Sequence, residues 1–289
     1  MPTILVFGWK GWIGGQMIPL LEASGFDVLK ADVRADEPGC VGKLLDECLP
    51  DHVLSLLGRT HGEGVTTIDY LELPGKLVEN IRDNLFAPLV VTEACSQRKI
   101  HFTYMGTGCI FCAEDPVKAS AYTEASDPDF FGSSYSTVKG FTDRLMRMSY
   151  EKGALNVRIR MPITSDMSER NFIAKITKYK RICSIANSMT VLPTLLPLLC
   201  DMIKRRETGT INMVNPGYIT HNDILELYKK HVDSGFTWEN FTIAEQNETL
   251  LSKRSNNVLD TKKLETMYPD VPHIKDAVEM VMQTIAMCE

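Results

Sequence analysis

Tyr135 and Lys139 have side chains that can move protons, and they lie four residues apart in the sequence. Positions i and i+4 share one face of a helix, so a helix here brings the phenol and the ammonium together. Free tyrosine has a pKa of about 10, and a nearby cation favours the phenolate. The pair therefore predicts a proton donor for a carbonyl oxygen near neutral pH. The alternative is an exposed helix pair without a function, because Tyr-x-x-x-Lys is common by chance.

A glycine-rich turn lies between an apolar run at residues 3–7 and a helical pattern at residues 12–24. Gly8 permits a tight turn, Gly11 lets the backbone approach a pyrophosphate, and Gly14 lets the helix pack close to the sheet. The free N–H groups at the helix start then bind the diphosphate of a dinucleotide. The residues predicted to bind the cofactor here are Gly8, Lys10, Gly11, Trp12, Ile13 and Gly14. An ordinary structural turn is the alternative.

The end of the second apolar run carries residues that select between nicotinamide cofactors. Asp32 can bind a ribose 2′-hydroxyl and favours NAD, whereas Arg34 can bind a 2′-phosphate and favours NADP. The charge of Lys10 favours NADPH, although Asp32 leaves NADH possible. Gly58 and Thr60 follow the third apolar run, where they either approach the cofactor or form an ordinary turn.

Strand and helix patterns alternate through the first half of the chain. We predict strands at 3–7, 27–31, 52–56, 100–104 and 156–160, and helices at 12–24, 69–97 (bent near Pro88) and 135–151. This alternation predicts an α/β fold with a Rossmann-type, doubly wound parallel sheet. We expect residues 1–162 to form the NADP-binding domain.

The second half of the chain has looser patterns. We predict helices at 171–178 and 274–287, a strand at 211–214, and a helix that ends near His231 and begins with a capping box at Thr220 and Asp223. Residues 163–289 are therefore expected to form mainly a smaller substrate-binding lobe, with some segments returning to the Rossmann domain.

Composition and charge exclude several classes of partner. The chain of 289 residues has a net charge of −6 without long runs of one sign, so we expect neither nucleic acid nor an anionic membrane as partner. Its eight cysteines show no disulfide framework and we find no secretory signal, which predicts a cytoplasmic protein. The apolar stretch 191–203 contains Pro193, Pro197 and Asp201 and is not expected to span a membrane.

Thr107 follows the predicted strand 100–104, whose end should lie at the crevice where such sheets bind ligands. Its hydroxyl can hydrogen-bond a substrate carbonyl beside Tyr135. The glycine turn, Thr107, Tyr135 and Lys139 come in an order that resembles an extended short-chain dehydrogenase/reductase.

Further segments sharpen this resemblance. They are Met105-Gly-Thr-Gly-Cys-Ile-Phe111, Arg158-Ile-Arg-Met-Pro-Ile163, Asn171-Phe-Ile-Ala-Lys-Ile176, Asn187-Ser-Met-Thr-Val-Leu192, Asn215-Pro-Gly with His221-Asn-Asp-Ile-Leu-Glu226, and Arg254-Ser-Asn-Asn257. Together they resemble the nucleotide-rhamnose synthase/epimerase-reductases of plants and some large viruses. The resemblance implies conversion of UDP-4-keto-6-deoxyglucose to UDP-L-rhamnose with NADPH, a separate 4,6-dehydratase that supplies the substrate, and a homodimer formed through the Tyr135 helix and the long helix before it.

The resemblance also assigns roles to single residues. It implies that Cys109 and Lys175 are the epimerase acid and base, and that Lys139 binds the nicotinamide ribose. It places Met161 and Ile163 at the cofactor, and Asn171, Lys175 and Arg254 at the substrate. The chemistry is consistent, because C3 and C5 flank the C4 ketone, and inversion needs a base on one face and an acid on the other.

Each of these candidate site residues also has an alternative explanation that does not involve the proposed reaction. Cys109 and Cys112 form Cys-x-x-Cys, which can bind zinc or do redox work, but no second pair or suitably spaced histidine follows, so we expect no metal. Cys109 can also be a buried inert thiol, and Lys175 a solvated lysine. Asn171 can be a helix cap, Arg254 a surface ion pair, and His221 part of a cap.

The protein as a whole has two alternative functions. It can be a reductase without epimerase activity or a non-catalytic subunit with the same fold.

Overall fold

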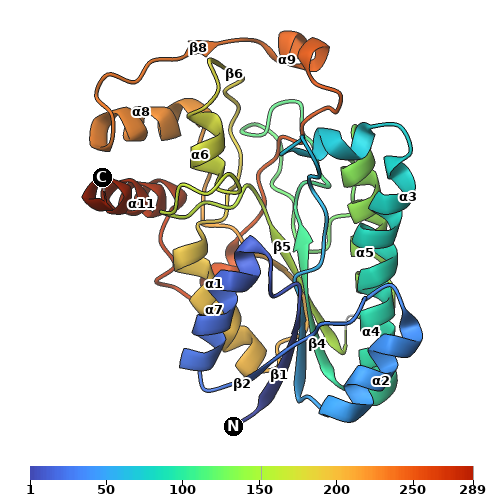
Figure 1. Ribbon diagram of the computed structural model, residues 1–289. Coiled ribbons are helices and arrows are strands. Elements are labelled where there is room, and N and C mark those ends of the chain that lie inside the picture. Colours follow the sequence, from blue (N-terminus) through green and yellow to red (C-terminus); the bar gives the residue numbers. More distant parts are fainter. Residues whose placement is uncertain (151, 289) are drawn as a thin grey trace.

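A six-stranded sheet organises the computed structural model, which describes residues 1–150 and 152–288 (Figure 1). Its strands are β1 (Thr3–Phe7), β2 (Asp27–Lys30), β3 (His52–Ser55), β4 (His101–Thr107), β5 (Ala154–Ile159) and β7 (Gly209–Asn212). All neighbours pair in parallel, in the order β2-β1-β3-β4-β5-β7. The central strands β3, β4 and β5 are buried along their whole length, as expected when helices cover both faces.

Helices pack on both faces of this sheet. One face carries α1 (Trp12–Ala23) and α7 (Leu192–Lys204), and the other carries α2 (Pro38–Cys48), α4 (Ala87–Arg98) and α5 (Ser134–Tyr150) (Figure 1). Two separate clusters of buried apolar residues fill these two layers. The doubly wound α/β fold is therefore confirmed. The helix predicted to reach Glu151 ends at Tyr150 in the structure, and Glu151 itself lies outside the described residues.

The second half of the chain has an apolar core of its own. This core lies among α6 (Phe172–Ile176), α8 (His221–His231) and α11 (Ile274–Cys288), beside the short strands β6 (Arg181–Ile182) and β8 (Glu239–Asn240). The predicted capping box of α8 is present, since Thr220 and Asp223 bond each other's backbone N–H groups. The boundary at residue 162 stays a prediction. The strand β7 and the helix α7 return to the sheet from the second half.

The long helix predicted at residues 69–97 is wrong. The structure has a 3-10 segment, η1 (Ile68–Glu72), then α3 (Lys76–Ile81), a π-helical turn, η2 (Arg82–Phe86), and finally α4. Pro74 and Gly75 separate the first two, because Gly75 takes a left-handed φ of 80° that ends helical geometry. The bend expected near Pro88 takes the form of the π-turn that precedes it.

Several elements had no clear pattern in the sequence. We did not predict α2 or α7, which both have proline in their first turn, nor α9 (Ile243–Thr249) and α10 (Lys262–Met267). The helix α9 has no buried residue and therefore no apolar stripe. No helix among the described residues is both long enough and apolar enough to cross a membrane.

Two histidines join β3 and β4 at the starts of these strands. His52 and His101 are register partners, and their Nδ1 atoms lie 3.3 Å apart. The Nε2 of His101 lies 2.7 Å from the carbonyl oxygen of Glu207. Because a carbonyl only accepts, Nε2 of His101 must carry its proton, and His52 then donates from Nδ1. Burial lowers the pKa of both rings, that of His52 to about 4.

This pair predicts a loss of stability in acid. An unfolded histidine titrates near pH 6.5, so between pH 6.5 and 4 the unfolded chain binds more protons than the folded one. The stabilisation is complete above pH 6.5 and is lost as the pH falls toward 4, by on the order of 3 kcal/mol for His52. In urea unfolding at pH 7.5 and 5, His52→Gln should lose less stability than the wild type. The exposed-histidine control His273→Ala should behave like the wild type, and equal losses in all three proteins would contradict the assignment.

Candidate active site

A cavity of about 880 Å³ lies at the carboxyl ends of the sheet strands. It brings together most of the residues predicted for the site. Those lining it are Gly8, Gly11, Trp12, Ile13, Gly14, Gly58, Thr60, Thr107, Cys109, Tyr135, Lys139, Met161, Lys175 and Arg254. Lys10, Asp32, Arg34, Ile163 and Asn171 lie outside this lining.

The glycine turn has the geometry that a dinucleotide needs. Gly8 has a left-handed φ of 78°, and a Cβ there would lie 3.0 Å from the Leu56 carbonyl. At Gly14 a Cβ would lie 2.5 Å from the Gly8 carbonyl oxygen, so the turn itself requires this glycine. No side chain of the described residues caps α1, whose N-cap is Gly11. The amino-terminal end of the helix is thus open to a diphosphate.

The residues predicted to select the cofactor form ion pairs on the surface. Lys10 Nζ lies 3.0 Å from Asp32 Oδ1, and both side chains are exposed. Arg34 lies 2.9 Å from Asp36. Each of the two cations is therefore paired with a carboxylate, so these contacts do not decide between them, and the selection between NADPH and NADH stays a prediction.

Thr107, Tyr135 and Lys139 lie together in the cavity, with exposed fractions of 7%, 9% and 4%. The Lys139 amino group donates to the Tyr104 hydroxyl and lies 4.5 Å from the centre of its ring. Burial raises the pKa of Tyr135 above its usual value, Cys109 raises it further, and the Thr107 hydroxyl acts in the opposite direction. Tyr135 therefore holds its proton, as a proton donor requires. Burial lowers the pKa of Lys139 to about 7.

Cys109 lies on the turn that follows β4, half-buried beside Tyr135 and Tyr70. Its backbone N–H donates to the Thr107 hydroxyl oxygen at 3.0 Å. It lines the cavity and is not enclosed in the core. No group of three or more His, Cys, Asp or Glu residues placed to hold a metal ion occurs in the described part of the chain.

Lys175 reaches the cavity from α6 and is half-buried. Burial lowers its pKa, and the charges of Arg170 and Arg254 lower it further. A lysine of this kind carries more neutral amine at neutral pH and can act as a base. The reading of Lys175 as a fully solvated lysine is therefore wrong.

Asn171 holds the helix that carries Lys175. Its side chain accepts from Ile173 N at 3.2 Å and donates to the carbonyl oxygens of Thr164 and Asp166. The residue is fully buried, so the structure gives it the role of a cap. Ile163 is also buried, and its N–H donates to the Thr190 carbonyl at 2.8 Å.

Arg254 forms an ion pair with Asp69 at 2.6 Å and also lines the cavity. Burial opposes ionisation of Asp69, but Arg254 and Ser252 bind its carboxylate and lower its pKa to about 2. The pair joins segments 185 residues apart and closes one wall of the cavity.

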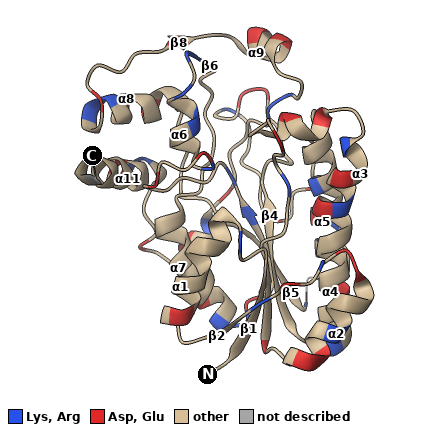
Figure 2. Ribbon diagram, viewed as in Figure 1, with Lys and Arg blue, Asp and Glu red and all other residues tan. Residues whose placement is uncertain are grey.

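The cavity lining carries many cations, of which the sequence analysis named only Lys139, Lys175 and Arg254. Figure 2 shows Lys and Arg (blue) on α6 and at β6. The described lining contains eight Lys and Arg side chains and one acidic side chain, Asp69. The cations are Lys139, Arg160, Arg170, Lys175, Lys178, Lys180, Arg181 and Arg254. The close spacing of basic residues from 170 to 181 was the available signal. This excess of positive charge suits an anionic ligand such as a diphosphate.

His221 also reaches the cavity, at the first position of α8. Its ring centroid lies 5.3 Å from that of Phe172, and its Nδ1 has no hydrogen-bond partner among the described residues. Burial lowers its pKa to about 4. The imidazole is therefore neutral at pH 7. It is not part of the cap of α8, which Thr220 and Asp223 form.

Comparisons with known proteins agree with this geometry. The chain is 49% identical over 280 residues to protein L780 of Acanthamoeba polyphaga mimivirus, with 96% of each chain covered. The crystal structure of the L780 UDP-rhamnose synthase superposes with a TM-score of 0.95, at 48% identity, and covers 98% of this chain and 99% of that one. A bifunctional dTDP-4-dehydrorhamnose 3,5-epimerase/reductase of Arabidopsis thaliana is 37% identical, over 95% of this chain and 90% of its own.

A more distant structure shows the same fold. The dTDP-4-dehydrorhamnose reductase of Bacillus anthracis, solved in complex with NADP, has a TM-score of 0.78 at 14% identity, with 97% of this chain and 98% of that chain covered. Residues 4–166 match the family described as NAD dependent epimerase/dehydratase. The chain therefore belongs to the NAD dependent epimerase/dehydratase family.

Proposed function

We propose that this protein is a bifunctional 3,5-epimerase and NADPH-dependent 4-reductase that converts UDP-4-keto-6-deoxyglucose to UDP-L-rhamnose. One observation carries the proposal: a single cavity holds two different acid–base sets. Thr107, Tyr135 and Lys139 suit reduction of a ketone, and Cys109 with Lys175 suits inversion of carbon centres. The likeness to the L780 UDP-rhamnose synthase over nearly the whole chain supports this assignment.

The reductive half uses Tyr135 as the proton donor. Its raised pKa keeps the phenol protonated until the C4 oxygen develops negative charge, and it then donates to that oxygen. The Thr107 hydroxyl binds the same oxygen. The glycine turn holds the cofactor diphosphate and Lys139 the nicotinamide ribose, and NADPH, when bound, supplies the hydride. Arg34 binds the 2′-phosphate.

The epimerising half uses groups from two separate elements. Cys109 comes from the end of β4 and Lys175 from α6, and both line the cavity. The C4 ketone acidifies the protons on C3 and C5. One of the two side chains takes the proton, Tyr135 and Thr107 stabilise the enolate oxygen, and the other side chain returns a proton to the opposite face.

The end of the cavity that carries Arg254 and the basic residues 170–181 holds the nucleotide diphosphate. Arg254 lies at its wall with Asp69, and the basic residues 170–181 line the same end. A 4,6-dehydratase supplies the 4-keto sugar. The seven described cysteines are free, which fits a reducing cytoplasm.

Removal of Cys109 tests the epimerase assignment. In deuterium oxide, Cys109→Ala should slow deuterium entry at C3 and C5, read by NMR, by about 100-fold or more, the usual scale for a general acid or base. NADPH binding, read by fluorescence, should be unchanged. The matched control is Cys112→Ala, which should exchange at the wild-type rate. Unchanged exchange in Cys109→Ala would contradict the assignment of Cys109, whereas a wild type without exchange at C3 and C5 would be a reductase without epimerase activity.

The variant Tyr135→Phe tests the proposed proton donor of the reduction. Loss of the phenol removes the donor for the C4 oxygen, so NADPH oxidation should fall by about 100-fold or more. Exchange should fall as well, because the same phenol stabilises the enolate. NADPH oxidation at the wild-type rate in this variant would refute the mechanism.

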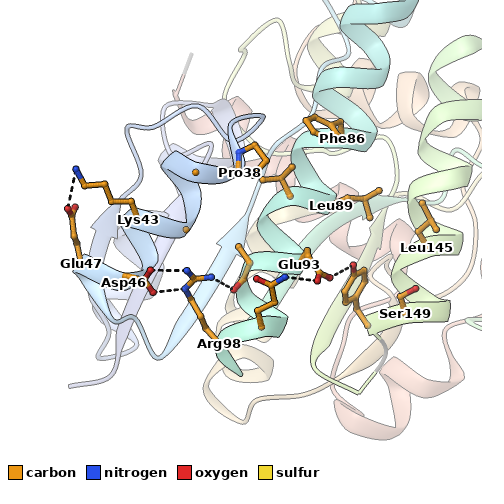
Figure 3. A pocket seen from close by; sticks show the side chains of 16 residues that line it. Pro38, Lys43, Asp46, Glu47, Phe86, Leu89, Glu93, Arg98, Leu145 and Ser149 are labelled. Atoms are coloured by element: carbon orange, nitrogen blue, oxygen red, sulfur yellow. Dashed lines mark hydrogen bonds and ion pairs between the residues drawn. The ribbon is translucent and has the colours of Figure 1, made fainter.

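A second proposal, a homodimer through α4 and α5, rests on an exposed apolar stripe. On α5, Phe141 and Met148 are 54% and 74% exposed, and Leu145 lies on the same helical face between them. Phe86 and Leu89 lie across a groove of about 870 Å³ from Leu145 (Figure 3). Apolar side chains in such a row are typical of an interface.

The dimer is tested by the mass in solution. Wild-type protein should sediment at twice the chain mass of 32.4 kDa, and Phe141→Asp with Met148→Asp should sediment as a monomer, because two buried charges oppose association. The control Met280→Asp changes an exposed apolar side chain on α11 and should leave the dimer intact. A monomeric wild type would contradict the proposal.

A further inference from the structure

His221 is the first residue of α8, and its imidazole has no hydrogen bond to any described residue. Its Nδ1 is enclosed and unpaired, which is rare for a buried polar atom. The residue also lines the cavity and is partly accessible, so the open edge of the ring, which carries Nε2, faces the cavity. The helix cap does not use this ring. The side chain is therefore available to a ligand.

The enclosed Nδ1 decides which ring nitrogen carries the proton. A neutral imidazole has one N–H donor and one acceptor nitrogen. A proton on Nδ1 would be a buried N–H without an acceptor, which is costlier than an acceptor atom left unpaired. The proton of His221 therefore lies on Nε2. The imidazole then presents one neutral N–H donor to the cavity, and its ligand must offer an oxygen acceptor.

His221 lies near both of the elements that carry the proposed epimerase groups. Its ring centroid is 5.3 Å from that of Phe172, which shares a face of α6 with Lys175, three residues further on. Arg160 is also close, because its charge adds to the effect of burial in lowering the pKa of His221. Arg160 in turn donates to the Gly108 carbonyl at 2.9 Å, next to the proposed epimerase cysteine. This part of the cavity is where the ring carbons of the sugar must lie.

The backbone on either side of His221 is fixed to the wall of the cavity. Asn187 and Ile219 exchange two backbone hydrogen bonds, at 3.0 and 3.1 Å. The N–H of Asn222 donates to the Ser184 hydroxyl at 3.0 Å. The imidazole is thus held in place before a ligand binds, and a donor that is already placed loses little entropy on binding.

We propose that His221 binds the hexose of the nucleotide sugar, by donating a hydrogen bond from Nε2 to one of its hydroxyl oxygens. The inference rests on the proposed function and deepens it, because it names a residue that recognises the sugar and not the nucleotide. A neutral N–H beside the Phe172 ring suits a neutral sugar with hydroxyl acceptors and apolar C–H groups. The diphosphate has cations in the same cavity instead, among them Lys178, Arg181 and Arg254.

The affinities for UDP-L-rhamnose and for UDP, measured by isothermal titration calorimetry, test the inference. His221→Phe keeps an aromatic ring against Phe172 and removes both nitrogens. It should bind UDP-L-rhamnose about tenfold more weakly than the wild type, the scale of one hydrogen bond, and UDP with unchanged affinity. His221→Gln keeps an N–H donor and should recover most of the affinity. The matched control His231→Phe changes the other end of α8, where His231 pairs with Glu279, and should bind both ligands as the wild type does.

Two results would overturn the inference. One is an equal loss of affinity for both ligands in His221→Phe, which would give the imidazole a structural role or a place at the nucleotide. The other is an unchanged affinity for UDP-L-rhamnose. If His221→Phe shows no cooperative unfolding, His221→Ala, which adds no atoms, replaces it in the same comparison. Turnover of UDP-4-keto-6-deoxyglucose by the wild type tests the proposed function separately, so an active enzyme with either result would refute only the role of His221.

Discussion

The close packing of the end of β4 against β5 is the constraint on which the whole site depends. A Cβ at Gly106 would lie 2.7 Å from the side-chain oxygen of Asn156, and one at Gly108 would meet Arg160. Glycine at these alternate positions lets the strand approach its neighbour. Thr107 and Cys109 then stand between and after them, joined by the 3.0 Å hydrogen bond from the Cys109 N–H to the Thr107 hydroxyl. The groups that we propose for reduction and for epimerisation thus share one turn of backbone.

Burial shifts the pKa values of the residues in this site more than direct ion pairing does. It raises the pKa of Tyr135 and lowers those of Lys139 and Lys175, because an enclosed cavity disfavours every charged form. The phenol therefore holds a proton to give, and the lysines approach the neutral amine that can accept one. Arg160 is the exception, since a guanidinium stays charged where an ammonium does not.

Much of the sheet and of the cofactor turn was predictable because the signals are local. Continuous apolar runs marked the buried strands, and Gly8 and Gly14 marked the turn. Long-range pairings were not predictable. The bond from Lys139 to Tyr104 crosses from a helix to a strand, and the Arg254–Asp69 pair spans 185 residues. No spacing pattern encodes such contacts.

Other errors arose where two local readings competed. Periodicity predicted one helix from 69 to 97, whereas Pro74 and Gly75 separate the 3-10 segment η1 from the helical run that begins at Lys76. Asn171 fitted both a cap and a ligand, and its burial together with the bond from Ile173 N decides for the cap. The cations at 170–181 were readable as residues, but only the fold shows that they line one cavity.

The most direct test of the account is the product made by the wild-type enzyme. Incubation with UDP-4-keto-6-deoxyglucose and NADPH in deuterium oxide, followed by NMR of the product sugar, reports both activities at once. The account predicts L-rhamnose with deuterium at C3 and C5. A D-configured 6-deoxyhexose without deuterium at these carbons would contradict it.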